Sequence, residues 1–399
     1  MRVAIVHPYP VHARAVGGTT RVYGLVRHLR ASGHEVTVLA HSSGTSDADR
    51  VAIDDLAGLG AVQRLFPLPR PSLLRRVPWA LGRVPYFVRR NRNPGLEAAL
   101  VALAPEVVHV EHALLAPLLS GVRARAPCIL AEQETMSVAI ERLRAATGRT
   151  PYEWYLLSQR RKVVAFERRA LSGYDRIWAI TRREASYLSE LAGREVGVLP
   201  HVVDTRVFAP REPDAGGARL LFVGNYAHRP NLHGIRWFVE QVWPRVRAAS
   251  PEALLELAGP GLDGAHRNLV ERAGGRILGR VEDLPAAYRA ASVVVNPIRS
   301  GAGMRGKVLE AFACGRAVVS TALGMEGIDA RPGEHFLLAD PPSAFAEAVV
   351  RYLRSAALRR QHGLASRALV ERAYDTRRVY PLVEAGLAAA VAARAGAAA

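Results

Sequence analysis

Short apolar runs alternate with helical patterns along almost the whole chain, and this alternation restricts the fold more than any other feature. At the N-terminus, Val3–Val6 forms an apolar run and is followed by a helical pattern over Val22–Leu29. Gly33 ends that pattern, and Glu35–Ala40 reads as the next strand. A strand, a helix and a strand within about forty residues is a βαβ unit, which implies a parallel sheet with a right-handed crossover.

The same pattern continues to the end of the chain in two series, separated by a polar stretch rich in proline and glycine over 209–217. The first series predicts strands at 107–110, 128–131, 176–180 and 196–199, and a long helix over 152–171. The second predicts strands at 220–223, 254–258, 277–279, 293–296 and 317–321, with helices over 232–249 and 343–353. We therefore predict an α/β fold of two doubly wound domains, 1–200 and 201–375, with a C-terminal helix over 376–399 that packs back toward the first domain.

A strand, a glycine-rich turn and a helix with basic residues at its start occur together between Val294 and Gly315. Backbone amides at the helix N-terminus favour anions, and the glycines let a diphosphate approach the backbone closely. A carboxylate lies one helical turn further on, roughly 6 Å along the axis, where ribose hydroxyls would be. The pattern favours a nucleotide site over a turn that uses glycine only to close. Its residues are Gly301, Gly303, Met304, Arg305, Gly306, Lys307 and Glu310.

Composition limits the class of protein further. The chain has 399 residues, 49% of them hydrophobic and 23% charged, which is typical of a globular protein of two or more domains. Uninterrupted apolar stretches of the ~18 residues that a membrane span needs are absent, and the N-terminus is too soon interrupted for a secretion signal. Cys128 and Cys314 are isolated in apolar surroundings, so we expect buried, reduced thiols and a cytoplasmic protein.

The formal net charge of +18 indicates an anionic partner, and the arginines are concentrated in one segment. No acidic residue occurs between Asp55 and Glu97, whereas arginines interleave there with leucines, Trp79, Tyr86 and Phe87. Basic residues mixed with aromatics are typical of an interfacial membrane patch, which would place the protein peripherally at the inner face of the cell membrane. The alternative is a loop of solvated arginines. The arginines of this segment, called the arginine-rich segment below, are Arg64, Arg70, Arg75, Arg76, Arg83, Arg89, Arg90 and Arg92.

Several motifs in order resemble those of one enzyme family. Gly17-Gly18 with Gly33-His34-Glu35-Val36 resembles the first helix of its acceptor domain. Leu221-Phe-Val-Gly-Asn225 and Arg229-Pro-Asn-Leu-His-Gly-Ile-Arg-Trp-Phe238 resemble the first strand and helix of its donor domain. Further matches are Ala258-Gly-Pro-Gly261, Leu278-Gly-Arg-Val-Glu-Asp-Leu284, Lys307-Val-Leu-Glu-Ala311 and Ala317–Ile328. The chain resembles the GT-B glycosyltransferases of the large retaining branch, the family 4-like or group 1 transferases, over nearly its whole length.

The resemblance implies two Rossmann-like domains facing a cleft and a role for each matched residue. Gly17 and Gly18 would lie beside the donor diphosphate, and Arg280 and Val281 against the nucleobase. Arg305 and Lys307 would hold the phosphates, and Glu310 would bind the ribose hydroxyls, in agreement with the charge pattern.

Three positions depart from the family pattern. Ala302 stands where a second glutamate, eight positions before the ribose-binding one, is usual. The arginine and lysine after the first donor-domain strand are replaced by Asn225 and a turn that contains Arg229, our candidate substitute for one of them. After the strand that ends at Ala131, Glu132-Gln133-Glu134 occupies the place of a histidine, and Gln133 is our candidate to contact a sugar hydroxyl.

Histidines and acids at strand ends are further candidates, because strand ends face the ligand crevice in this architecture. His112 is the strongest of them, with His7 and Glu111 behind it, while His109 fits a core residue better. The spacing of His residues gives no metal site, and Asp47-Ala-Asp49 lies in a Ser/Gly/Asp stretch that we interpret as a loop.

We therefore predict a glycosyltransferase, without cofactor or metal, that moves a sugar from a nucleotide diphosphate sugar. Its acceptor would be an anionic or lipid-linked molecule of polysaccharide assembly; a soluble natural-product aglycone is the nearest alternative. An epimerase acting on the donor alone shares the architecture and stays open. A Rossmann dehydrogenase lacks its glycine motif here, and a nucleic-acid partner lacks a recognisable module.

Overall fold

The computed structural model describes residues 1–13, 18–42, 44–68, 82, 84–144, 151–210, 217–301 and 303–398. The chain divides into two compact units. The N-terminal unit consists of Met1–Pro200 together with Tyr380–Ala399, and the C-terminal unit of His201–Val379. Each unit has an apolar core built around one parallel sheet. The mixed α/β architecture predicted from the alternating pattern is therefore confirmed.

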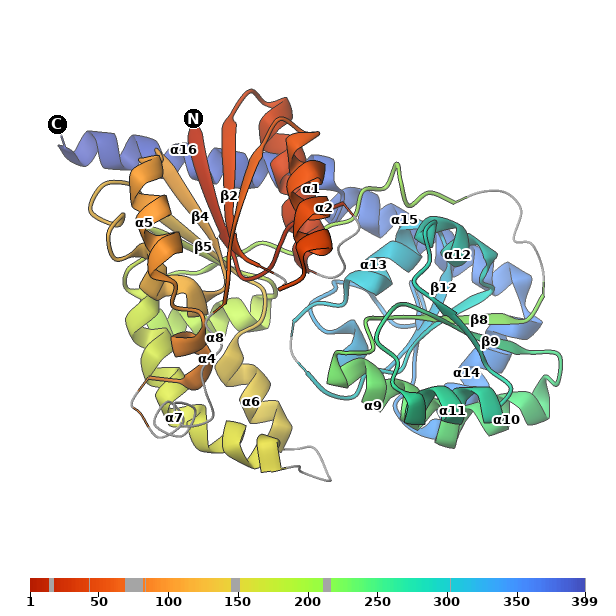
Figure 1. The fold of residues 1–399 in the computed structure, drawn as a ribbon. Coiled ribbons are helices and arrows are strands. Elements are labelled where there is room, and N and C mark those ends of the chain that lie inside the picture. Colours follow the sequence, from red (N-terminus) through yellow and green to blue (C-terminus); the bar gives the residue numbers. More distant parts are fainter. Residues whose placement is uncertain are drawn as a thin grey trace. The chain divides into compact units, whose positions relative to one another are not determined.

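The N-terminal unit contains a seven-stranded sheet with the order β3-β2-β1-β4-β5-β6-β7, and every pairing is parallel. In Figure 1, α1 and α2 lie on one side of this sheet and α5 on the other. The strands are β1 (Arg2–His7), β2 (Glu35–His41), β3 (Val62–Phe66), β4 (Val107–Glu111), β5 (Cys128–Glu132), β6 (Arg176–Ala179) and β7 (Gly197–Val198). The helices are α1 (Gly18–Ala31), α2 (Ser46–Ala57), α4 (Tyr86–Arg90), α5 (Pro94–Leu103), η1 (Ala113–Leu119), α6 (Met136–Arg144), α7 (Pro151–Leu171), α8 (Arg182–Ala192) and, from Tyr380 onward, α16 (Thr376–Ala398).

The last helix, α16, packs on α1 within the N-terminal unit. The Tyr380 hydroxyl donates to the backbone carbonyl of Arg21 at 2.8 Å, and it sits where a Cβ on Gly24 would be. Glu384 bonds to the imidazoles of His28 and His34 at 2.7 and 2.9 Å. These contacts explain why the C-terminal residues group with the start of the chain.

The C-terminal unit repeats the architecture with a six-stranded parallel sheet of order β10-β9-β8-β11-β12-β13. Its strands are β8 (Arg219–Val223), β9 (Leu254–Ala258), β10 (Arg276–Gly279), β11 (Val293–Asn296), β12 (Ala317–Ser320) and β13 (Leu337–Leu338). Its helices are α9 (Arg229–Trp237), η2 (Phe238–Val242), α10 (Trp243–Ala249), α11 (Gly264–Arg272), α12 (Leu284–Ala290), α13 (Gly306–Ala313), η3 (Leu323–Met325), α14 (Pro342–Arg354) and α15 (Ala356–Ala373).

Strand order locates the functional edge of each sheet. In both sheets the chain first adds strands on one side of the first strand and then returns to the other side. The direction therefore reverses between β1 and β4 and again between β8 and β11. Ligands of doubly wound sheets bind outside the carboxyl ends of the strands at such a reversal. His7 and Glu111 end the first pair of strands, and Val223 and Asn296 end the second.

Some local expectations were wrong. Asp47 and Asp49 lie in the first turn of α2 instead of a loop, where their charge complements the helix dipole. Arg64–Phe66, at the start of the arginine-rich segment, form part of the edge strand β3, which the sequence pattern did not predict. The helix predicted over 232–249 starts earlier, at Arg229, and contains the π-helical turn η2. Most of the arginine-rich segment lies outside the described residues, including Arg70, Arg75, Arg76, Trp79 and Arg83.

Both cysteines are buried and unpaired, as expected, and burial raises the pKa of each thiol to about 12. Among the helices in the described part of the chain, none is long and apolar enough to span a bilayer.

Candidate active site

The glycine-rich turn of the C-terminal unit joins β11 to α13, and glycine is required at two of its positions. Gly301 and Gly303 have φ of +91° and +79°, a region that residues with a side chain rarely adopt. A Cβ on Gly301 would also lie 2.9 Å from Cγ of Pro230. The turn delivers the chain into α13 at Gly306, beside the buried imidazole of His201. Met304 is buried next to it, and Ala302 lies outside the described residues.

Lys307 is the second residue of α13, and its ammonium is held in place. Its Nζ donates to Oδ1 of Asn231 at 2.6 Å and lies 4.5 Å from the centre of the Phe222 ring. The Asn231 amide in turn donates to the backbone carbonyl of Asn225 at 2.7 Å, so the turn after β8 is tied to α13. Burial, reinforced by the charge of Arg305, lowers the pKa of Lys307 to about 7. An anion that arrives here would favour the charged ammonium.

Glu310 lies one turn further along α13 and shares its carboxylate with a core tyrosine. The hydroxyl of Tyr288, on α12, is within 2.7 Å of Glu310 Oε2 and within 3.1 Å of the Lys307 carbonyl. Burial raises the pKa of Glu310, although the Tyr288 bond and the Lys307 charge oppose this shift. Within the described part of the chain, the side-chain hydrogen bond to Glu310 is made at Oε2, so the carboxylate is oriented and Oε1 could accept a bond from a ligand hydroxyl.

Arg305 caps the start of α13 with its side chain folded back on the turn. Its guanidinium donates to the carbonyls of Gly303 and Ser300 at 2.8 and 3.4 Å. The residue therefore fixes the shape of the turn in addition to its charge, a role that the sequence did not suggest.

The other predicted donor residues lie in turns of the same unit. The Asn225 side chain accepts from the amide of Ala227 at 3.0 Å and so stabilises its own turn. Arg229 is exposed at the first position of α9. Arg280 is exposed and Val281 half-buried in the turn between β10 and α12.

In the N-terminal unit, Gln133 lies against Gly18. A Cβ on Gly18 would fall 1.7 Å from Oε1 of Gln133, so only glycine fits at the start of α1 with this side-chain position. The Gln133 amide donates to Glu111, which also accepts two bonds from Nη2 of Arg21 at 2.6 and 2.9 Å. Gly17, its partner in the motif, lies outside the described residues.

Glu111 is the centre of a buried polar cluster at the carboxyl end of β4. His109 bonds to it at 2.9 Å, and both side chains are fully enclosed. Burial alone would raise the pKa of Glu111, but Arg21 and His109 together hold it well below the ordinary value. Burial lowers the pKa of the neighbouring His7 to about 4, so that imidazole is neutral at physiological pH.

His112 lies just beyond β4, because the strand ends at Glu111 and does not continue through it. Its φ of +79° is unusual for a residue other than glycine. Its Nδ1 is 3.1 Å from Oε1 of Glu132, whose second oxygen accepts from the amide of Ala113 at 2.6 Å. Burial opposes the charged imidazole, yet the bond to Glu132 and the nearby carboxylates raise the pKa of His112 overall.

Several of the predicted residues thus lie in two clusters, one in each unit. Lys307, Glu310 and the glycine turn are joined in the C-terminal unit; Gly18 and Gln133 are joined in the other, where His112 bonds separately to Glu132. Tyr288, Asn231 and Arg21 were missed, because a single tyrosine, asparagine or arginine in a helix carries no signal of its distant partner. In the described part of the chain, no three His, Cys, Asp or Glu side chains are grouped as metal ligands.

Comparison with known families agrees with this arrangement. Residues 16–207 match the family described as glycosyltransferase family 4, and residues 217–355 match the family described as glycosyl transferases group 1. The two matches cover most of both units. The chain is a group 1 glycosyltransferase with the GT-B fold.

Relatives support the family assignment, and solved structures share the fold. The phosphatidyl-myo-inositol mannosyltransferase of Mycobacterium tuberculosis is 26% identical over 94% of this chain and 93% of its own. An uncharacterised protein in the cps region of Klebsiella pneumoniae is 25% identical, over about half of each chain (52% and 55%). Sucrose-phosphate synthase from Thermosynechococcus elongatus has the same fold, with a TM-score of 0.74 at 20% identity over 98% and 99% of the two chains. Anabaena HepE, solved with UDP and glucose, has a TM-score of 0.69 at 13% identity over 97% and 99%.

Proposed function

We propose that this glycosyltransferase takes a sugar from a nucleotide diphosphate donor and transfers it with retention of configuration, without a metal ion. The observation that carries the proposal is the order of groups along α13. Backbone amides at its start, Lys307 in its first turn and the oriented carboxylate of Glu310 follow one another as diphosphate and ribose do in a nucleotide. The UDP complexes of HepE, which shares the fold, support this kind of donor.

The chemistry that these residues can perform is electrostatic. When the sugar–phosphate bond breaks, negative charge grows on the leaving diphosphate, and the backbone amides at the start of α13 and the Lys307 ammonium would stabilise it. Arg305 adds positive charge and keeps the turn in shape. In the proposed mechanism the acceptor hydroxyl attacks from the face that the diphosphate leaves, and a departing phosphate oxygen takes the hydroxyl proton.

For the acceptor, we propose a lipid-linked or anionic molecule of glycan assembly, handled by a protein that binds the membrane surface reversibly. The proposal is supported by the arginine-rich segment. It is supported further by two relatives, one named for phosphatidyl-myo-inositol and one encoded in a cps region. The N-terminal unit, with Gln133 and His112 at its strand ends, would orient the acceptor hydroxyl.

The test is a donor screen followed by product analysis. Nucleoside diphosphates and nucleoside diphosphate sugars are first compared by thermal shift. A ligand at 100 times its Kd raises the free energy of unfolding by about 2.7 kcal/mol. The best donor is then incubated in chelator with a membrane lipid extract, and the new glycosidic linkage is assigned by NMR. A product of inverted anomeric configuration would contradict retention. Conversion of the donor alone into another sugar nucleotide would contradict glycosyl transfer and indicate an epimerase.

A further inference from the structure

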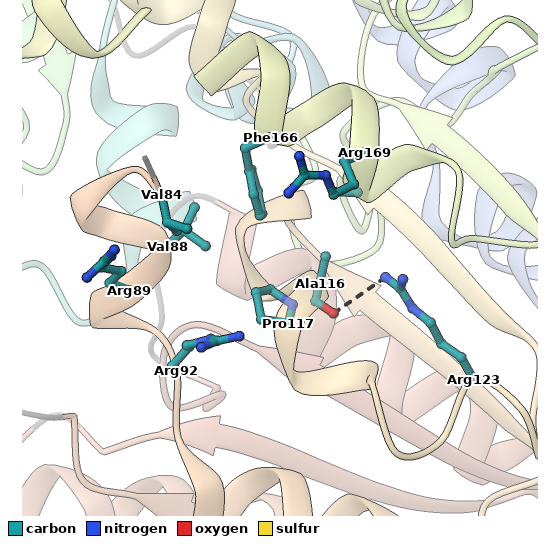
Figure 2. Close-up of a pocket in the computed structure, with 10 residues that line it drawn as sticks. Val84, Val88, Arg89, Arg92, Ala116, Pro117, Arg123, Phe166 and Arg169 are labelled. Atoms are coloured by element: carbon teal, nitrogen blue, oxygen red, sulfur yellow. Dashed lines mark hydrogen bonds between the residues drawn. The ribbon is translucent and has the colours of Figure 1, made fainter. Parts of the chain in front are cut away.

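A pocket in the N-terminal unit, separate from the residues above, combines positive charge with apolar walls. Its volume is about 610 Å³, within the ~300–1,000 Å³ usual for small-molecule sites. Three elements that are distant in sequence surround it: α4, η1 and the C-terminal half of α7 (Figure 2). It is lined by Val84, Val88, Arg89, Arg92, Ala116, Pro117, Arg123, Phe166, Arg169 and Ala170.

The pocket carries four arginines and, among these ten residues, no acid. The guanidinium groups of Arg89, Arg92 and Arg169 form no hydrogen bond or ion pair with any residue in the described parts of the chain. Arg123 is different, because it is held by the carbonyl of Ala116 at 3.4 Å and lies 5.3 Å from the centre of the Tyr174 ring. One arginine is therefore fixed by the protein, and three are available to an anion from solution.

The apolar walls beside the arginines limit which anion fits the pocket. Val88 and Ala170 are buried, and the Phe166 ring is directed into the pocket between the arginines in Figure 2. A free phosphate ion would gain nothing from these groups. A phosphate that carries a hydrocarbon chain would place its charge on the guanidinium groups, which bind phosphate oxygens in pairs, and its methylenes on the valine and the ring.

We propose that this pocket binds the phosphate group of an anionic lipid. The inference rests on the proposed function and deepens it, because it names where the acceptor-binding unit meets a lipid phosphate. Arg89 and Arg92 come from the described end of the arginine-rich segment. Arg169 and Phe166, from α7, complete the site, so membrane affinity requires a built pocket and not the segment's charge alone.

The chain offers a matched control for this distinction. Arg90 and Arg168 are exposed neighbours of Arg89 and Arg169 on the same two helices, yet they do not line the pocket. The double variants Arg89→Gln/Arg169→Gln and Arg90→Gln/Arg168→Gln therefore remove the same charge from the same elements. Melting temperatures of both variants and the parent protein establish that each is folded.

Sedimentation with vesicles of phosphatidylcholine, with and without an equal part of phosphatidylglycerol, measures the effect. The pocket variant should lose about 30-fold in partitioning to the anionic vesicles, which is ~2 kcal/mol, because the charge-assisted hydrogen bonds to the phosphate are lost with the two arginines. The control variant should lose less than about threefold, as expected for screened surface charge. An equal loss of vesicle binding in both variants would indicate diffuse electrostatic attraction and would overturn the pocket proposal. No loss in either variant would overturn it as well.

A second measurement separates a lipid phosphate from a free one. Titration calorimetry compares inorganic phosphate with a short-chain, monomeric phosphatidylglycerol. The lipid should bind the parent protein and bind at least tenfold more weakly to Phe166→Ala, with recovery in Phe166→Leu, because the apolar contact is half of the site. Equal binding of phosphate and lipid would reduce the pocket to a simple anion site and refute the proposal.

Failure of this inference can be told apart from failure of the proposed function. The pocket variant should keep the thermal shift given by the nucleotide donor, since none of its residues belongs to the C-terminal unit. A protein that binds vesicles through the pocket but no nucleotide sugar would contradict the proposed function only. A protein that binds the donor, but whose vesicle binding does not depend on Arg89 and Arg169, would contradict the pocket proposal only.

Discussion

Replacing the Glu310 carboxylate with an amide is the sharpest test of the donor site. Glutamine has the same shape and can still accept the bond from Tyr288, so Glu310→Gln removes charge with little change in packing. It also removes a carboxylate whose raised pKa shows that burial disfavours its charge. The melting temperature of the free enzyme should therefore stay nearly unchanged or rise slightly.

The effect on donor binding follows from the bonds left to Glu310. Tyr288 occupies Oε2, and the remaining lone pairs can accept from the two ribose hydroxyls. Hydrogen bonds to a charged group contribute ~1.5–3 kcal/mol, and neutral ones ~0.5–1.5 kcal/mol. For bonds to two hydroxyls, the change from carboxylate to amide should therefore cost ~2–3 kcal/mol, or about 30-fold to 150-fold in Kd.

The same residue predicts a pH dependence. The ribose hydroxyls need the charged carboxylate, so donor affinity should fall as the pH drops through the pKa of Glu310. Because burial raises that pKa above the ordinary 4.5, the loss should begin at a higher pH than for an exposed glutamate. This component should be absent in Glu310→Gln, whose side chain does not titrate.

Calorimetric titration of the nucleoside diphosphate into both proteins, over a range of pH, measures both effects. Glu347→Gln, an exposed position on α14 of the same unit, is the control and should bind as the parent does. If Glu310→Gln binds the nucleotide with unchanged affinity and the same pH profile, the ribose assignment is refuted.

Three further predictions concern the leaving group, the metal and the buried cluster. Lys307→Met should lower kcat more than it raises KM for the donor, and a change in KM alone would limit Lys307 to ground-state binding. The turnover rate should be the same with and without a chelator. Activity that needs added magnesium or manganese would contradict the mechanism. Arg21→Met should lower the free energy of unfolding by ~3–5 kcal/mol in chemical denaturation, since it leaves Glu111 buried without its cation. The lowered pKa of Glu111 adds stability above the unfolded carboxylate pKa, and this is lost as the pH falls toward the folded value.

Regular apolar periodicity made most of the fold predictable. Strands such as Val293–Asn296 and Cys128–Glu132 are buried along their whole length, and such runs stand out in a sequence. The edge strand Val62–Phe66 was missed because it is covered only in part and carries an arginine, so its pattern resembles that of a loop. Helix α2 was missed because serines and aspartates, which favour its first turn, are also common in loops.

The sequence by itself determined the class of fold, the order of the two units and the glycine turn before α13, because each depends on residues that are neighbours in the chain. Only the tertiary structure decided which side chains meet. Tyr288 orients Glu310 from another helix, Asn231 holds Lys307, and Arg21 joins Glu111 across the sheet edge. The pocket between α4, η1 and α7 is likewise a product of packing. Periodicity records which face of an element is buried, but the partner on that face is chosen by how whole elements pack together.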